Sequence, residues 1–358
     1  MTKSPEGRRW KVAVLGATGA VGQRLIQLLE QHPWFEVSAV AASGRSAGKP
    51  YSDAARWLLE TRIPASVASM KVLPCNSDLE ADLALSGLDA AVAGEIEHSI
   101  AEAGIPVISN ARNHRMESDV PLLVPEINAA HAEAISLQRS NRGWKSGFLV
   151  TNPNCSTMGL VLALAALAAR FTVKRALVST MQAISGAGYP GVASLDILGN
   201  IIPHISGEEE KMETETRKIL GHLGPRGFEP SECAVSAQCH RVPVQDGHLM
   251  AVSTDLEGSP SVEPVREAFG SYQSSIEDLD LPSHPRPVII LRNEPDRPQP
   301  RFDVMAGNGM AITVGRVRPC PILGTKFSVL VHNTIRGAAG AAILNAEFLV
   351  AKGHVKPR

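Results

Sequence analysis

A strand, a glycine-rich turn and a helix follow one another near the start of the chain, and this succession limits the possible folds more than any other feature. Residues 11–15 (Lys-Val-Ala-Val-Leu) form a continuous apolar run, typical of a strand buried on both faces. The turn 16–22 (Gly-Ala-Thr-Gly-Ala-Val-Gly) leads into residues 23–29, where apolar positions recur at helical spacing. Backbone N–H groups of such a turn can hold a pyrophosphate at the helix N-terminus. The pattern therefore favours a nucleotide site over a plain turn.

The next strand indicates which nucleotide binds. Residues 35–42 form it, and the turn 43–49 that follows contains no Asp or Glu to hold the ribose 2′-hydroxyl of NAD. Ser43, Arg45 and Ser46 could instead hydrogen-bond and neutralise a 2′-phosphate, unless Arg45 is merely a solvated loop charge. We therefore predict NADP rather than NAD. The expected contacts in the glycine-rich turn are Gly16, Thr18, Gly19, Ala20, Val21 and Gly22.

Strands and helices alternate through the rest of the first half. The patterns predict helices at residues 53–59 and 95–103, and strands at residues 66–73, 88–92, 106–109 and 148–150. This alternation predicts an α/β fold with a parallel, doubly wound sheet. The loop 110–115 leaves the sheet at its carboxyl edge, where such folds bind ligands. Arg112 and Arg115 in that loop are either anion ligands or solvated charges.

The second half has a different pattern. Residues 171–183 form a long alternating strand, and residues 234–244 are expected to pair with the strand around Thr254 as a hairpin across the turn 245–248. Further strands are expected at residues 288–291, 311–317 and 326–331, and a closing helix within residues 332–349. We predict a largely antiparallel sheet with helices on one face, whose edges could support a dimer.

Cys155 is the first candidate for a chemical role. The sequence Asn152-Pro153-Asn154 provides turn and capping residues directly before it, and the apolar run 160–169 predicts a helix behind it. A thiol at a helix N-terminus should have a lowered pKa. Otherwise Cys155 is one more small buried hydrophobic residue.

Other polar residues have two readings each. Glu208 and Lys211 lie three residues apart and so share one helix face, where an exposed salt pair is the simpler interpretation. Arg241 and His248 flank the predicted hairpin turn, and neither position compels a function.

Composition limits the partners and the cellular compartment that are expected for the protein. The 35 basic and 36 acidic side chains are balanced and form no basic stripe, which argues against nucleic acid and anionic membranes as partners. The first nine residues have no apolar core behind them for a signal peptide, and the run 160–169 is too short to span a bilayer. Five cysteines at unrelated spacings suit a reducing compartment and offer no metal-binding pair. We expect a cytoplasmic protein without a metal ion.

Taken together, these segments resemble the aspartate-β-semialdehyde dehydrogenase family, in its fungal and archaeal-like branch. The shared motifs are residues 16–22, 43–49, 109–111 with Arg115, 152–157, 182 with the loop 185–188, 207–211, 241–248 and 333–340. The resemblance implies an NADP-binding Rossmann domain (1–154), an α+β catalytic and dimerisation domain (155–332) and a C-terminal helix (333–358) that returns to the first domain. It also implies a homodimer or homotetramer.

The resemblance implies a role for each matching residue. Cys155 would be the nucleophile, His248 the general acid/base, and Gln182 an orienting group near the thioester. Arg241 and Glu208 look like the binders of the substrate carboxylate and amine, and Arg115 and Lys211 like the phosphate-binding pair. Asn154 would help to bind the oxyanion, while Ser185, Gly186 and Asn333 would contact the cofactor. In one departure, residues 93–97 (Ala-Gly-Glu-Ile-Glu) stand where relatives usually carry a Ser-Ala-Leu-Pro-like loop beside the cofactor.

The chemistry of these residue types agrees with that reaction. A thiolate can form a thioester, a histidine titrates near the working pH, and Arg with Lys can hold the phosphate that cleaves the thioester. A biosynthetic cell would reduce L-4-aspartyl phosphate with NADPH, toward lysine, threonine and methionine. The alternatives are a malonyl-CoA-type acyl-thioester reductase without a phosphate site, a non-redox Cys/His hydrolase or acyltransferase, and a non-catalytic NADP-binding protein.

Overall fold

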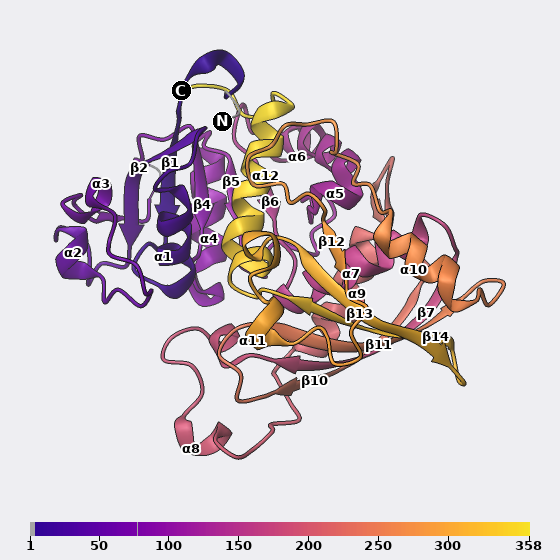
Figure 1. The fold of residues 1–358 in the computed structure, drawn as a ribbon. Helices are drawn as coiled ribbons and strands as arrows, with labels where there is room; N and C mark the ends of the chain where they lie inside the picture. Colours follow the sequence, from indigo (N-terminus) through magenta and orange to yellow (C-terminus); the bar gives the residue numbers. More distant parts are fainter. Residues whose placement is uncertain (1–3, 77) are drawn as a thin grey trace.

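Two six-stranded sheets organise the chain (Figure 1). The structure, a computed structural model, describes residues 4–76 and 78–358. The first sheet is parallel, with the order β3-β2-β1-β4-β5-β6. Its strands are β1 (Trp10–Leu15), β2 (Phe35–Ala42), β3 (Leu73–Pro74), β4 (Leu83–Ser86), β5 (Val107–Ser109) and β6 (Leu149–Thr151). This confirms the predicted doubly wound sheet.

Alternate residues of β1 enter two separate cores. Trp10, Val12 and Val14 pack with helices α1 (Ala20–Leu29) and α12 (Gly340–Ala351), whereas Ala13 and Leu15 pack with α4 (Ala90–Glu102). Side chains alternate between the faces of a strand, so both faces of the sheet are covered and its strands read as continuous apolar runs.

The second sheet is mixed, with the order β10-β7-β11-β14-β13-β12. Its strands are β7 (Val173–Gln182), β10 (Ala234–Arg241), β11 (His248–Leu256), β12 (Ile289–Leu291), β13 (Ile312–Cys320) and β14 (Gly324–Val331). The pairings β7–β11, β11–β14 and β13–β14 are antiparallel, as expected, but β10–β7 and β12–β13 are parallel. The predicted hairpin of β10 and β11 is wrong, because β7 lies between these strands and bonds to both.

Helices cover one face and one edge of this sheet. The almost entirely buried α7 (Cys155–Ala168) packs into the second core with residues of α9 (Glu208–Ile219) and α10 (Val262–Gly270). Along the edge strand β10, Glu209 accepts from the N–H of Cys239 and Glu213 from that of Ala237, both at 3.0 Å. Helix α9 is thereby fixed against free N–H groups that would otherwise remain open to other strands.

The remaining elements are short and lie in connections. They are α2 (Tyr51–Ala54), α3 (Ala65–Ala68), α5 (Pro125–Asn128), α6 (Ala134–Arg142), α8 (Ser194–Ile197), α11 (Pro300–Asp303), β8 (His222–Gly224), β9 (Gly227–Glu229), the 3-10 turns Pro5–Gly7, Ala129–Glu133, Ile184–Ala187 and Ala306–Gly309, and a π-helical turn Ile335–Ala339.

Two predictions between β2 and β4 are wrong. The helix expected at residues 53–59 stops at Ala54, because the buried amide of Gln23 bonds to the Arg56 carbonyl and the Leu58 N–H instead. The strand expected at residues 66–73 begins inside the helix α3, which follows Pro64, and only its last residue belongs to β3.

The strand expected at residues 88–92 is also wrong. The strand is β4, which ends at Ser86, and the Asp89 side chain accepts from the Ala91 N–H to cap α4. Residues 93–97 therefore lie inside a helix, and the segment that follows the strand is Gly87-Leu88-Asp89. The departure from the family pattern that was inferred at residues 93–97 is therefore wrong, because the loop after the strand does not lie there.

The end of the chain returns to the first sheet, as the yellow α12 beside β5 and β6 shows in Figure 1. The turn before α12 carries Arg336, whose Nη1 lies 2.7 Å from Oε1 of Glu126, and both side chains are fully buried. This ion pair ties the π-helical turn to α5.

Removing one partner of this pair should be costly, since it leaves an uncompensated buried charge. We predict that Arg336→Met lowers the free energy of unfolding by about 3–5 kcal/mol, measured by denaturant titration. Arg336→Met with Glu126→Leu should recover most of the loss. A single variant within about 1 kcal/mol of the unchanged protein would contradict a structural role for the pair.

Candidate active site

The N-terminus of α7 carries the candidate nucleophile. Oδ1 of Asn154 accepts from the N–H groups of Ser156 at 2.9 Å and Thr157 at 3.3 Å, so Asn154 is the N-cap and Cys155 is the first helical residue. The prediction from Asn-Pro-Asn is confirmed in this respect. Gly337 packs so tightly against Cys155 that a Cβ on it would lie 2.7 Å from the Cβ of Cys155.

His248, the first residue of β11, faces this thiol. Its Nε2 lies 3.2 Å from Sγ of Cys155, and its Nδ1 accepts from the Ala183 N–H at 3.0 Å. Because Nδ1 is an acceptor, the hydrogen bonds assign the proton of the neutral ring to Nε2, which points at the sulfur. Burial, aided by the charge of Arg241, lowers the pKa of His248 to about 3, so the ring is neutral in this state.

The thiol itself does not have the lowered pKa that its position predicted. Burial first, and then the charge of Glu208, raise the pKa of Cys155 to about 12. The N–H of Ser156 and the charges of Arg115 and Arg241 act in the opposite direction but do not outweigh them. The sequence indicated the helix N-terminus correctly. It did not indicate that the thiol is buried, or that the carboxylate of Glu208, which is distant in sequence, lies near it.

Glu208 is the centre of a hydrogen-bonded cluster. It accepts from Nδ2 of Asn154 at 3.0 and 2.9 Å, from Nε2 of Gln182 at 3.0 Å and from Nζ of Lys211 at 2.7 Å. Burial opposes its ionisation, but the charge of Lys211 and these donors lower the pKa of Glu208 overall. Gln182 also accepts from Thr180, so its amide is directed at Glu208 rather than at Cys155.

Arg115 belongs to a second cluster, which centres on Glu215 of α9. Its Nη1 donates to Glu215 at 2.8 Å and its Nη2 to the Asn110 carbonyl at 2.7 Å, while Glu215 also accepts from the Asn154 N–H at 2.6 Å. Arg112 is exposed, and its guanidinium lies with the Lys211 side chain beside Gly207. The predicted pair Arg115 and Lys211 is thus near the site, with each cation paired to a carboxylate.

The remaining candidates surround the turn that follows β7. Nη1 of Arg241 donates to the Ala183 carbonyl at 2.7 Å, and a Cβ on Gly186 would lie within 3.0 Å of both Arg241 and His248. Asn333 accepts from the Gly247 N–H and donates to Ser185 Oγ, both at 2.8 Å. These contacts join the catalytic side of the second sheet to the C-terminal segment.

The glycine-rich turn forms a backbone cradle. A Cβ on Gly16 (φ +69°) would lie 2.7 Å from the Gly87 carbonyl oxygen, and one on Gly22 would lie 2.3 Å from that of Gly16. Gly19 is the N-cap of α1 and brings no side chain over the helix N-terminus. Thr18, Ala20 and Val21 complete the turn. This narrow, side-chain-free approach to a helix N-terminus fits a dinucleotide pyrophosphate.

A cavity of about 310 Å³ connects this turn to the catalytic half. Ala20 and Arg24 of α1 line one side, and Ser185, Tyr189 and Thr334 line the other. Ser43, Arg45 and Ser46 follow the carboxyl end of β2, where Ser43 and Arg45 are exposed and Ser46 is partly buried. Of the predicted cofactor residues, Ala20 and Ser185 line this cavity, one from each half of the chain.

Glu215 and Lys218 were missed at the sequence level. Nζ of Lys218 donates to the carbonyls of Arg115, Glu117 and Val120 at 2.7–2.9 Å, which fixes the loop that carries Arg115. The signal was available, since Glu208, Lys211, Glu215 and Lys218 recur at helical spacing on one face of α9.

Known proteins resemble the chain over nearly its whole length. Residues 11–135 match the family described as "Semialdehyde dehydrogenase, NAD binding domain", and residues 164–336 match "Semialdehyde dehydrogenase, dimerisation domain". The chain is 50% identical over 343 residues to an aspartate-semialdehyde dehydrogenase of Archaeoglobus fulgidus, covering 96% of this chain and 98% of that one. It is 49% identical over 351 residues to that of Schizosaccharomyces pombe, covering 96% and 98%.

A solved structure supports the same relationship. The crystal structure of aspartate semialdehyde dehydrogenase with NADP from Candida albicans superposes with a TM-score of 0.89 at 46% identity, covering 97% of this chain and 100% of that one.

The raised pKa of Cys155 predicts how its reactivity depends on pH. In the cofactor-free protein, we expect alkylation of Cys155 by iodoacetamide to rise about tenfold per pH unit between pH 7 and 9, without a plateau, because only the rare thiolate reacts. Peptide mass spectrometry would follow Cys155 separately from the other cysteines. A plateau reached below pH 8 would show that the helix N-terminus outweighs burial.

Proposed function

Because the chain belongs to the aspartate-semialdehyde dehydrogenase family, we propose that it reduces L-4-aspartyl phosphate to L-aspartate 4-semialdehyde and phosphate with NADPH, through a thioester on Cys155. The observation that carries the proposal is the contact of Cys155 with His248 at 3.2 Å, at the start of a helix and beside the Glu208 cluster. The relatives' names favour this reading over a malonyl-CoA-type reductase.

The cofactor site uses residues from both halves. The turn 16–22 would hold the pyrophosphate, Ser43, Arg45 and Ser46 the 2′-phosphate, and Ser185, Gly186 and Asn333 the nicotinamide end. When bound there, NADPH supplies the hydride that reduces the thioester carbonyl. Reduced discrimination between NADPH and NADH in Arg45→Ala would test the 2′-phosphate contact.

Cys155 and His248 perform the covalent steps. The Cys155 thiol loses its proton to solvent, because Nε2 of His248 already carries one, and the charges of Arg115 and Arg241 favour the resulting thiolate. The thiolate attacks the acyl carbon, and phosphate leaves with the electrons of the broken C–O bond. Nε2–H of His248 donates to the sulfur or to the adjacent oxyanion, because the Ala183 N–H occupies Nδ1. After reduction, collapse of the tetrahedral adduct expels the Cys155 thiolate and releases the aldehyde.

Each charged group of the substrate would be bound by a different residue of the site. Arg241 would bind the α-carboxylate and Glu208 the α-ammonium group, while Arg115 and Lys211 would bind phosphate. Asn154 and Gln182 both donate to Glu208 and would orient it, which keeps the amine subsite beside Cys155. The bidentate hold of Asn154 on Glu208 leaves His248 as the principal side-chain donor for the oxyanion.

We place the domain boundaries at residues 1–154, 155–332 and 333–358. The first boundary precedes α7, which packs into the second core, and the last follows β14, where the chain turns back toward α1. In this division, the nucleophile belongs to one domain and the N-cap that precedes it to the other.

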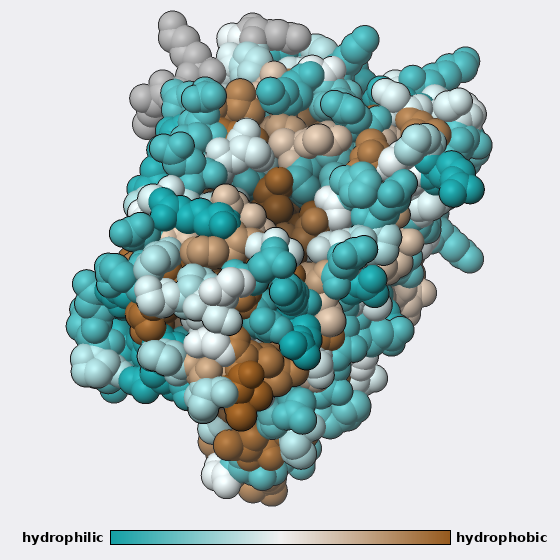
Figure 2. Space-filling view, turned by 90° about the vertical axis from the view of Figure 1, so that its right-hand side faces the viewer, coloured by the Kyte–Doolittle hydropathy of each residue, from teal (hydrophilic) through white to brown (hydrophobic). Residues whose placement is uncertain are grey.

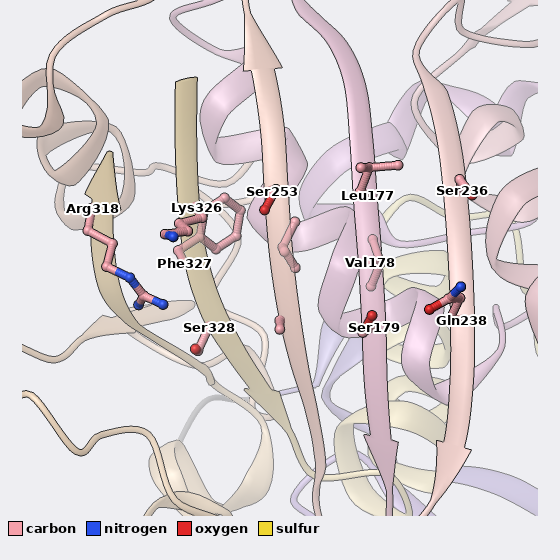
Figure 3. Close-up of a pocket in the computed structure, with 12 residues that line it drawn as sticks. Leu177, Val178, Ser179, Ser236, Gln238, Ser253, Arg318, Lys326, Phe327 and Ser328 are labelled. Atoms are coloured by element: carbon pink, nitrogen blue, oxygen red, sulfur yellow. The ribbon is translucent and has the colours of Figure 1, made fainter. Parts of the chain in front are cut away.

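The second half carries the family's dimerisation domain, and we propose that the open face of the second sheet forms a homodimer, which could pair further into a tetramer. Figure 3 shows this face, where a shallow cavity of about 320 Å³ is lined by Leu177, Ser179, Ser236, Ser253, Lys326 and Ser328. Leu177 is 48% exposed there. Small side chains allow two such faces to approach closely.

We also propose a cytoplasmic location and a place in the synthesis of lysine, threonine and methionine. Within the described residues, no helix is long and apolar enough to cross a membrane. The balanced charge favours neither nucleic acid nor membrane lipids as partners. Cell fractionation with an antibody to the chain would test the location.

The proposed reaction can be followed in reverse. Purified protein given L-aspartate 4-semialdehyde and NADP should form NADPH only when inorganic phosphate is present, measured by absorbance. Cys155→Ser should lower the rate at least about a thousandfold, because it removes the nucleophile, whereas Cys320→Ser should retain activity. Phosphate-independent turnover, or activity in Cys155→Ser, would contradict the proposal.

The proposed interface also predicts a change in oligomeric state. Leu177→Asp should convert the dimer to a monomer in sedimentation or light-scattering measurements, because it places a charge in the centre of the contact. Leu195→Asp is a matched control, since Leu195 is 91% exposed on α8, where Figure 2 shows apolar surface at the lower end of the molecule. Dissociation by the Leu195 variant alone would move the interface to α8.

A further inference from the structure

The carboxylate of Glu208 has no free acceptor site in this structure. One oxygen accepts from Asn154 and Lys211, and the other from Asn154 and Gln182, at 2.7–3.0 Å. Two carboxylate oxygens offer about four lone-pair positions, so these four contacts saturate the group. A substrate ammonium group can reach Glu208 only if one of the present donors leaves.

Lys211 is the donor that can leave. Asn154 is fixed because its other amide atom caps α7, and Gln182 is fixed because Thr180 donates to its amide oxygen. Lys211 is 21% exposed, its side chain is flexible, and Glu208 is its one hydrogen-bonding partner among the described residues. Exchange of one cation for another also keeps the buried carboxylate neutralised, which loss of a neutral donor would not achieve.

The ammonium group of Lys211 has the guanidinium of Arg112 as its neighbour. Both side chains lie beside Gly207. If Gly207 carried a Cβ, that atom would lie 3.9 Å from Nη1 of Arg112 and 3.8 Å from Cε of Lys211. Across residues 4–76 and 78–358, the structure gives the Arg112 side chain no ion pair. Two neighbouring cations without a carboxylate repel each other, and a dianion such as phosphate relieves that repulsion.

We propose that Glu208 exchanges Lys211 for the α-ammonium group of the substrate, and that the released Lys211 then completes the phosphate site of Arg115, to which Arg112 adds a further cation. This inference rests on the proposed function, and it adds that amine recognition and phosphate affinity are coupled. An acyl compound without the ammonium group leaves Lys211 on Glu208 and the phosphate site incomplete. By linkage, phosphate strengthens binding of the amine by the same factor.

The coupling can be measured without turnover. Inorganic phosphate is titrated calorimetrically into the full chain loaded with NADP, in the presence of L-2-aminobutanoate or of butanoate, which lacks the ammonium group. We expect the aminobutanoate to tighten phosphate binding about tenfold and the butanoate to leave it unchanged. Equal phosphate affinity with both compounds overturns the exchange.

Variants separate the exchange from a purely structural role. Glu208→Gln should tighten phosphate binding without any amine, because Lys211 is then free, and should abolish the effect of aminobutanoate. A structural role alone predicts the opposite, namely weaker phosphate binding. Glu210→Gln, an exposed position on the same turn of α9, is the control for the lost charge and should retain the coupling.

The outcome is distinct from that of the activity assay. A protein that forms NADPH but shows no coupling retains the proposed function and loses the exchange. If aminobutanoate still tightens phosphate binding in the Lys211→Met variant, the proposed exchange is likewise wrong.

Discussion

The backbone N–H and the side-chain amide of Asn154 both donate to carboxylates of α9, and the position of Cys155, the proposed nucleophile, depends on these two contacts. The backbone N–H of Asn154 donates to Glu215 and its side-chain amide to Glu208, while its amide oxygen caps α7. An N-cap residue sets where a helix begins, and here that point is Cys155. The start of the catalytic helix is therefore fixed from a second helix as well as by its own capping.

Helix α9 is in turn fixed on three sides. Glu209 and Glu213 bond to the edge of β10, Lys218 holds the loop of Arg115, and Glu208 and Glu215 face α7. Buried charges are costly unless paired and hydrogen-bonded, and here the pairs Glu208–Lys211 and Glu215–Arg115 also position the groups that we propose to bind the substrate. One helix thus contacts the edge of the second sheet, the loop of Arg115 and the N-cap of α7, so the proposed change in the Glu208–Lys211 pair would occur beside all three.

Local patterns were sufficient for much of the fold and for the start of α7. The apolar runs of β1 and β2 and the glycine turn identified the first sheet, and Asn154 identified the helix that begins at Cys155. Distant contacts explain what was missed. The insertion of β7 between β10 and β11, and the hold of Gln23 on residues 56–58, leave no short-range signal. The raised pKa of Cys155 likewise depends on burial and on Glu208, which is far away in sequence.

The most direct test of Cys155 as the covalent residue is to trap its acyl group. Protein mixed with L-aspartate 4-semialdehyde and NADP in the absence of phosphate should form about one NADPH per site and then stop, because nothing cleaves the thioester. Rapid acid quenching and peptide mass spectrometry should then find the aspartyl group on the peptide that contains Cys155. An aspartyl adduct on another cysteine, or a burst of NADPH without any adduct, would contradict the mechanism.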